Sequence, residues 1–219
     1  IRPSLLNSKH KQPSPERIKY SKSMTHKEIT EQSKRLLLLT GAKLFGSKGY
    51  DATSISVIEK DLNQTRGAIA YHFKSKLGLF EESVMFSSVP EEYRGRLKDF
   101  YVKYVSMLEE ECLEMMNGGI RNVAGTFLSL EADALRNLPD FRNKCTELKH
   151  RQASVLELVV GRAIQNGEIK SDIIPSVIAD LFMNVVIGQN YRSNVEGSRY
   201  YTDGMLHQFN SIYRLISNQ

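Results

Sequence analysis

Hydrophobic residues recur at spacings of three and four along most of the chain from about residue 30 onward, which is the period of helices with one apolar face. No stretch alternates apolar and polar residues as a strand would, and no glycine-rich phosphate loop occurs. The pattern therefore predicts an all-α fold with about nine helices. We expect them at about residues 30–47, 53–62, 65–73, 75–86, 93–117, 120–134, 139–166, 171–189 and from 198 onward.

Residues 53–76 are the most informative stretch, because they predict two short helices joined by a tight turn. Thr53 and Ser54 carry hydroxyl groups suited to capping the first helix, and Thr65 can cap the second. Asn63 lies where the chain must turn, and Asn tolerates a left-handed backbone. Two helices joined in this way form a helix-turn-helix, whose second helix enters the major groove of DNA.

The second helix of this pair leaves a donor-rich side outward once its apolar residues face the core. Arg66 is the candidate for a guanine N7/O6 contact, and Gln64 is a candidate adenine reader. Phosphate contacts that set the register are expected mostly from Thr53, Thr65, Tyr71, His72, Lys74 and Lys76. The full predicted DNA-binding set is Thr53, Ser54, Gln64, Thr65, Arg66, Gly67, Ala68, Tyr71, His72, Lys74 and Lys76.

Several short motifs in and around this stretch match the pattern of a known family. They are Thr53-Ser54, Ile58, the run Thr65-Arg66-Gly67-Ala68-Ile69, His72-Phe73, Ser75-Lys76 with Leu79, and an upstream helix over 34–50 that ends in Gly49-Tyr50. Together they resemble the TetR family of transcriptional regulators over roughly residues 32–86. The resemblance implies a three-helix N-terminal DNA-binding domain, a larger helical ligand-binding and dimerisation domain, and a bacterial, cytoplasmic protein.

Four positions depart from the family pattern. Glu59 stands where the family has a small Ala, Asn63 replaces a turn Gly, and Gln64 replaces an apolar turn residue. Ala70 stands where the family has a phosphate-contacting Tyr. Tyr71 follows directly, but it points about 100° further round the helix.

The predicted organisation has three parts. Residues 1–29 form a basic, proline-broken arm expected to be disordered or tag-like, 30–86 form the DNA-binding domain with its reading pair at 53–73, and 87–219 form the ligand-binding and dimerisation domain. Met24 resembles a natural start, so the preceding segment is either a vector-derived or leader extension or a basic arm that adds nonspecific phosphate contacts.

Charge is distributed unevenly between the two ends of the chain. Up to residue 85, 15 Lys and Arg residues face 8 Asp and Glu residues, whereas the remainder carries 15 against 17. A basic module joined to a slightly acidic one suits a protein that binds a phosphate backbone with one end only. Charge alone is equally compatible with any soluble protein, so it supports DNA binding only together with the helix-turn-helix.

The middle helices could enclose a small effector that is apolar or aromatic. Tyr104, Leu108, Phe127 and Phe182 are candidate wall residues, with Glu131 and Gln189 as polar anchors. Ordinary core packing is the alternative for aromatic residues at helical spacing. The resemblance implies an effector that alters the spacing of the two reading helices, which requires that the effector bind one spacing more tightly than the other.

The last two helices have more apolar surface than packing within one chain needs. Part of this surface should be buried between subunits, which predicts a homodimer. The candidate interface residues are Val186, Ile187, Tyr201, Met205, Ile212 and Ile216, with an entirely intrachain core as the alternative. A two-fold dimer sets its reading helices about one DNA turn (~34–36 Å) or a multiple apart, and therefore requires a palindromic operator.

Other function classes find little support. Cys112 and Cys145 form no CxxC motif and are expected to be reduced structural thiols, with a regulatory redox pair as the alternative. The five histidines show no metal-ligand spacing, so no metal, cofactor or catalytic site is predicted and the chain is not expected to be an enzyme. No apolar run approaches 18 residues, so no membrane span is predicted.

The sequence thus predicts a ligand-responsive, DNA-binding transcriptional regulator, specifically a repressor that a small molecule releases from a palindromic operator. The alternative is a DNA-anchored adaptor whose helical domain binds a protein partner. An enclosed pocket would favour the first, and a solid core with an exposed apolar patch would favour the second.

Overall fold

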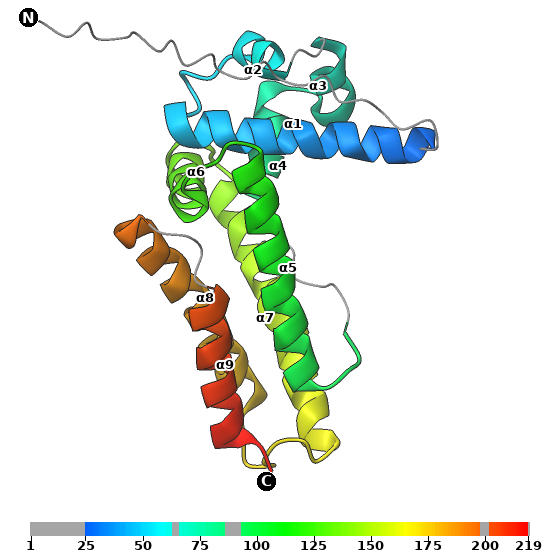
Figure 1. Cartoon of the computed structure of the whole chain (residues 1–219), viewed down its shortest axis with the longest axis vertical. Coiled ribbons are helices and arrows are strands. Elements are labelled where there is room, and N and C mark those ends of the chain that lie inside the picture. Colours follow the sequence, from blue (N-terminus) through cyan, green and yellow to red (C-terminus); the bar gives the residue numbers. More distant parts are fainter. Residues whose placement is uncertain (1–24, 63–65, 86–92, 198–201, 219) are drawn as a thin grey trace, which may run out of the picture.

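The computed structural model describes residues 25–62, 66–85, 93–197 and 202–218, and these residues form nine helices without a β-strand (Figure 1). The all-α prediction is confirmed. The helices are α1 (His26–Lys48), α2 (Ile55–Leu62), α3 (Arg66–Phe73), α4 (Lys76–Val84), α5 (Leu97–Asn117), α6 (Val123–Asn137), α7 (Phe141–Gln165), α8 (Pro175–Glu196) and α9 (Thr202–Ile216). Within the described residues, no helix has the length and apolar character needed to cross a membrane.

Helix α1 begins four residues earlier than the periodicity predicted, because polar residues cap its start. The Thr25 hydroxyl accepts a hydrogen bond from the backbone N–H of Glu28, and the Glu28 carboxylate accepts one from the N–H of Thr25 at 2.7 Å. The predicted arm over 1–29 is therefore wrong in its last four residues, which are helical. The start of the arm, 1–24, lies outside the described residues.

Helices α2 and α3 lie on the side of α1 that faces away from α5 to α9 (Figure 1). Their inner residues join one hydrophobic cluster with the inner faces of α1 and α4. The fully or almost fully buried members of this cluster include Leu37, Phe45, Ile58, Ile69, Phe73, Leu79 and Phe80. The expected apolar spacing of the helix-turn-helix is thus used for burial, and its polar side is left at the end of the molecule.

The same cluster continues into the helices that follow the DNA-binding segment. It includes Met115 near the end of α5, Leu130 and Ala134 of α6, and Phe141 at the start of α7. Helix α6 approaches α1 so closely that a methyl group on Gly46 would collide with the side chain of Thr126. The predicted boundary between the two domains therefore separates chain segments, but the hydrophobic core crosses it.

A second cluster fills the far end of the molecule between α5, α7, α8 and α9. At its centre the rings of Phe182 and Phe209 stack with centroids 4.5 Å apart, and the Tyr101 ring lies 5.7 Å from Phe182. The Tyr101 hydroxyl donates to Asn210 Oδ1 at 2.8 Å, so the polar end of this buried ring is satisfied. Burial raises the pKa of Tyr101 to about 12.

Candidate nucleic-acid interface and effector cavity

The outer face of α3 carries exposed residues of the kind that DNA contacts require. Gly67, Ala70, Tyr71 and Lys74 are exposed, and the Tyr71 side chain retains 74% of its accessible surface. Ala68 is half-buried against the first cluster. Of the predicted polar side, the structure therefore places Tyr71 and Lys74 in solvent.

Three of the predicted contacts cannot be placed in full. Gln64 and Thr65 lie outside the described residues. Arg66 is the first residue of α3, but its side chain is likewise not described. Its assignment to a guanine edge stays a prediction that depends on its position in the first turn of the helix.

Thr53 was wrongly assigned to the DNA-facing surface. Its side chain is fully buried, and its hydroxyl donates to the carbonyl of Gly49 at 2.9 Å, with the carbonyl of Leu44 a further acceptor at 3.2 Å. Hydrogen bonds from Thr53 thus connect the end of α1 with the start of the helix-turn-helix. Capping of α2 falls to the exposed Ser54, whose Oγ accepts from the N–H of Val57.

Lys74 ends α3 in a left-handed conformation, with φ of +64°. Its N–H still donates to the carbonyl of Ala70, and the chain then enters α4 through Ser75, which caps that helix by accepting from the N–H of Gly78. A left-handed conformation costs an L-residue roughly 1–2 kcal/mol, which is why glycine usually occupies such a position. An exposed lysine stands here instead.

Lys76 occupies the first turn of α4, where its charge opposes the helix dipole. The structure supplies a local explanation, because its Nζ lies 4.0 Å from the centroid of the Tyr50 ring. The contact with Tyr50 explains the lysine without a phosphate, and the phosphate contact at this helix N-terminus stays a prediction.

His72 is half-buried beside the exposed Tyr71 ring, with the two ring centroids 4.9 Å apart. Burial, and after it the charge of Lys34, lowers the pKa of His72 below its usual value. Both effects favour the neutral imidazole, and the phosphate contact of His72 stays a prediction.

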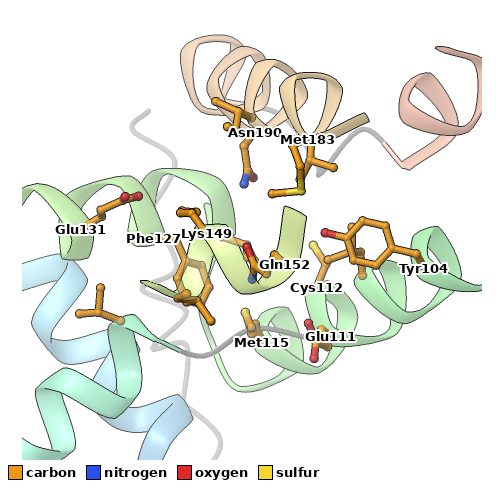
Figure 2. A pocket seen from close by; sticks show the side chains of 16 residues that line it. Tyr104, Glu111, Cys112, Met115, Phe127, Glu131, Lys149, Gln152, Met183 and Asn190 are labelled. Atoms are coloured by element: carbon orange, nitrogen blue, oxygen red, sulfur yellow. The ribbon is translucent and has the colours of Figure 1, made fainter. Parts of the chain in front are cut away.

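Away from this surface, a cavity of about 180 Å³ lies between α5, α6, α7 and α8 (Figure 2). Four of the six predicted pocket residues line it, namely Tyr104, Leu108, Phe127 and Glu131. Phe182 lines a small apolar pocket whose walls also include Tyr104, Gln152, Met183 and Val186 of the main cavity. Gln189 is buried and lines neither.

Apart from Glu131, the sequence interpretation missed the charged and amide side chains of the cavity. These are Glu111, Lys149, Gln152 and Asn190. Glu111 could have been found, because it follows Leu108 by three residues and Tyr104 by seven and so shares their face of the helix. The other three come from α7 and α8, whose positions around the cavity depend on tertiary packing.

Glu111 connects the cavity electrostatically with α1. Burial raises the pKa of its carboxyl to about 7, although the charge of Arg35 on α1 acts in the opposite direction. The Arg35 guanidinium itself forms a two-pronged ion pair with Glu114, with Nε 2.6 Å from Oε1. One arginine of the DNA-binding segment therefore acts on two carboxylates of α5, one of which lines the cavity.

The predicted dimer residues lie largely inside the monomer. Met205 is fully buried and Ile216 is almost so, and both belong to the second cluster, against which Ile212 and Val186 also pack. Ile187 is exposed and lines the cavity, and Tyr201 lies outside the described residues. Periodicity identified these residues as apolar, but α5 and α8 cover them within the same chain.

Exposed apolar side chains form a stripe along the outer side of α8 instead. Val177, Leu181, Tyr191 and Val195 retain between 44% and 65% of their surface, and their spacing places them on one face of the helix. The neighbouring α7 adds Leu158, which is 61% exposed and lines a shallow groove beside α8. We call these five residues the α7–α8 stripe.

Comparison with known proteins identifies the N-terminal segment. Residues 37–83 match the family described as bacterial regulatory proteins, tetR family. Over 41 residues the chain is 44% identical to the biofilm operon icaADBC HTH-type negative transcriptional regulator IcaR of Staphylococcus aureus strain Newman, and over 56 residues it is 38% identical to the HTH-type transcriptional regulator AcrR of Shigella flexneri. These matches span 19% and 26% of this chain and only 22% and 26% of the relatives.

Solved structures extend the likeness to the whole fold. The full-length TetR regulator TylP from Streptomyces fradiae aligns with a TM-score of 0.64 at 19% identity, over 86% of this chain and 88% of that one. A TetR-family regulator from Cytophaga hutchinsonii aligns with a TM-score of 0.61 at 20% identity, over 90% and 100%. The predicted resemblance to the TetR family is therefore confirmed for the helix-turn-helix segment. Along most of the chain, the structures of these regulators show the same fold.

Proposed function

We propose that this protein is a homodimeric transcriptional repressor that binds a palindromic operator through α3 and is released from it by a small molecule. The observation that carries the proposal is the solvent-exposed polar face of α3 within a segment that matches TetR regulators. Both curated relatives are described as transcriptional regulators, and IcaR as a negative one. The adaptor alternative receives no support from these comparisons.

In this proposal the base contacts come from the start of α3 and the phosphate contacts from its end. Arg66, in the first turn, reads guanine, with Gln64 beside it as the candidate adenine reader. Tyr71, Lys74 and Lys76 lie at or after the last turn, where their side chains can reach the DNA backbone. Thr53 is excluded from the contact set by its burial.

The α7–α8 stripe is the dimer surface of this proposal. Its apolar side chains follow one side of a 22-residue helix, which a second copy can cover by placing its own α7 and α8 antiparallel to the first pair. Glycines Gly161 and Gly188 have no heavy atom within 4 Å of an added Cβ, so the described residues leave this approach open. A two-fold axis here places the two α3 helices on equivalent half-sites.

Selection of bound sequences from random duplex DNA tests the function directly, and two variants test the assignment of contacts. Arg66→Ala should relax sequence preference at one position by about 1–3 kcal/mol, because it removes a bidentate base contact. Lys76→Ala should weaken binding to all sequences alike and reduce the salt dependence. Lys103→Ala, an exposed lysine on α5, is the matched control and should change neither.

Enrichment of a palindrome by the wild-type chain supports the proposal. Absence of any enriched sequence overturns the function, whereas equal loss of affinity without altered preference in both variants overturns only the division between base and phosphate contacts.

A further inference from the structure

The cavity is lined by both carboxylate and aromatic side chains. Among the described residues that line it, two carboxylates, Glu111 and Glu131, face one ammonium group, that of Lys149. Lys149 is exposed, whereas both carboxylates are half-buried. The Glu131 carboxylate also accepts from the Cys145 thiol at 3.5 Å, so Glu111 is the carboxylate more available to a ligand. The local charge therefore favours a cation over an anion.

A second polar group faces the same space from α8. Figure 2 shows the Asn190 amide directed into the cavity, across from Gln152. The Asn190 Oδ1 atom is buried and has no hydrogen-bond donor among the described residues. A buried acceptor without a partner is unfavourable, and a ligand with an N–H or O–H donor removes that cost.

The remaining walls are apolar and extend toward the second cluster. Phe127, Met115 and Met183 line the cavity, and the small adjoining pocket is lined by Phe182 and Phe209. Such walls suit an aromatic or branched apolar body, because soft thioethers and rings both pack well against one.

We propose that the cavity binds a compact organic amine in its protonated form, with its ammonium paired with Glu111, a polar hydrogen donated to Asn190, and its apolar body against Tyr104 and Phe127. A neutral ligand would exclude solvent from the Glu111 carboxylate without supplying an opposite charge. An anion would exclude solvent in the same way and would also be repelled by the carboxylate. A protonated amine supplies the missing opposite charge and N–H donors at once.

The position of Glu111 also gives the amine a route to the DNA-binding segment, a consequence that rests on the proposed function. Arg35 of α1 acts on Glu111 and is ion-paired with Glu114 one turn further along α5. An ammonium at Glu111 takes over the neutralisation that Arg35 provides and repels the guanidinium. The amine therefore favours an arrangement in which α1 lies further from α5.

Calorimetric titration of the full chain tests the binding inference without DNA. The probes share one skeleton: phenylpropylamine, phenylpropanol, phenylpropionate and trimethyl(phenylpropyl)ammonium. We expect the primary amine to bind at least ~10-fold more tightly than the alcohol, the carboxylate to bind weakest, and the trimethylated cation to lose affinity because it lacks N–H donors. Equal affinity for amine and alcohol, or tightest binding of the carboxylate, overturns the inference.

Two substitutions assign the effect to one carboxylate. Glu111→Gln should lower the affinity for the amine at least ~10-fold and leave that for the alcohol unchanged, so alcohol binding also reports an intact cavity. Glu111→Asp keeps the charge and should retain the preference for the amine. Glu110→Gln, on the exposed neighbouring position, is the matched control and should behave as wild type. An unaltered preference in Glu111→Gln contradicts the assignment.

Proton release on amine binding reports the ion pair with Glu111, because a ligand held only by its fit to the cavity walls would release no proton. Because the Glu111 carboxyl has a pKa of about 7, it is about half protonated at pH 7 and must ionise to pair with the amine. Titrations in phosphate and Tris buffers at pH 7 should therefore show release of about half a proton per amine bound, and none in Glu111→Gln. Equal proton release by the wild type and by Glu111→Gln throughout the neutral pH range contradicts the ion pair.

The experiments distinguish failure of the proposed function from failure of the amine-binding inference. If the chain selects a palindrome but binds no amine, only this inference fails. If it binds the amine through Glu111 but selects no DNA, the cavity assignment stands and the proposed function fails.

Discussion

Two residues that the sequence assigned to the same phosphate surface have opposite environments. Thr53 is buried and holds two backbone carbonyls, whereas Lys74 is exposed and ends α3 in a left-handed conformation. A hydroxyl residue before a helix can cap that helix, contact a phosphate or donate a hydrogen bond to a carbonyl of a neighbouring helix. The sequence could not distinguish these three roles. The exposure of Tyr71 and Lys74, by contrast, followed from helical spacing alone.

Thr53→Val should destabilise the protein by about 1–3 kcal/mol, because it removes the hydroxyl donor of the Gly49 carbonyl at a fully buried position. Urea unfolding measures the change. Ser54→Ala is the neighbouring control at an exposed position and should cost about 1 kcal/mol or less through its cap. A stable Thr53→Val that loses only DNA affinity would restore the original assignment.

Lys74→Gly should weaken DNA binding without lowering the stability of the protein. Glycine adopts the left-handed conformation without strain, so the variant should be as stable as wild type or up to ~1 kcal/mol more stable. It should nevertheless bind DNA more weakly, with the slope of log affinity against log salt reduced by about 0.9, the value for one phosphate contact. Unchanged salt dependence would remove Lys74 from the contact set.

At the scale of elements, periodicity predicted every helix that the structure describes, and their ends differ by a few residues. The start of α1 moved because a capping box adds a turn that contains no apolar repeat. What periodicity could not supply is the partner of each apolar face. Helix α1 packs against α2 and α3, and it also packs against α6 and is ion-paired with α5.

Arg35→Ala tests the electrostatic connection between α1 and the cavity. Removing the guanidinium should raise the pKa of the Glu111 carboxyl above about 7, because Arg35 is the charge that lowers it. Carbon-detected NMR titration of the carboxyl measures this shift. Lys34→Ala is the adjacent control, since Lys34 is paired with Glu82 and should leave Glu111 unaffected.

Arg35→Ala should also change how the free energy of unfolding depends on pH. A carboxyl whose pKa is raised in the folded state favours folding most below its unfolded value of 4.5 and loses that contribution as pH rises through about 7. The unfolding free energy of Arg35→Ala should therefore fall more steeply than that of wild type between these pH values. A flatter profile than wild type would contradict the connection.

For the whole molecule, composition and spacing predicted the fold class and four residues of the cavity, but not the surface that we propose for dimerisation. Met205 and Ile216 were as apolar as any interface residue, yet α5 and α8 cover them. The α7–α8 stripe has polar residues and glycine between its apolar members, so it was the weaker pattern in the sequence.

Leu181→Glu should convert a dimer into a monomer, because it places a charge in the middle of the stripe. Sedimentation equilibrium measures the association. Leu215→Glu on α9 is the matched control, since Leu215 is 74% exposed but lies off the stripe, and it should leave association unchanged. Dissociation by the control and not by Leu181→Glu would move the dimer surface to α9.

The tight contact between Gly46 of α1 and Thr126 of α6 limits how freely the first four helices can be exchanged with those of a relative. A chimera that joins them to a foreign effector body would meet a different side chain where Thr126 stands and would lose the apolar residues of α6 that complete their core. A functional graft therefore has to carry α6 along with α1 to α4. The DNA-binding segment and the helical body are thus joined by packing that any exchange of segments would have to preserve.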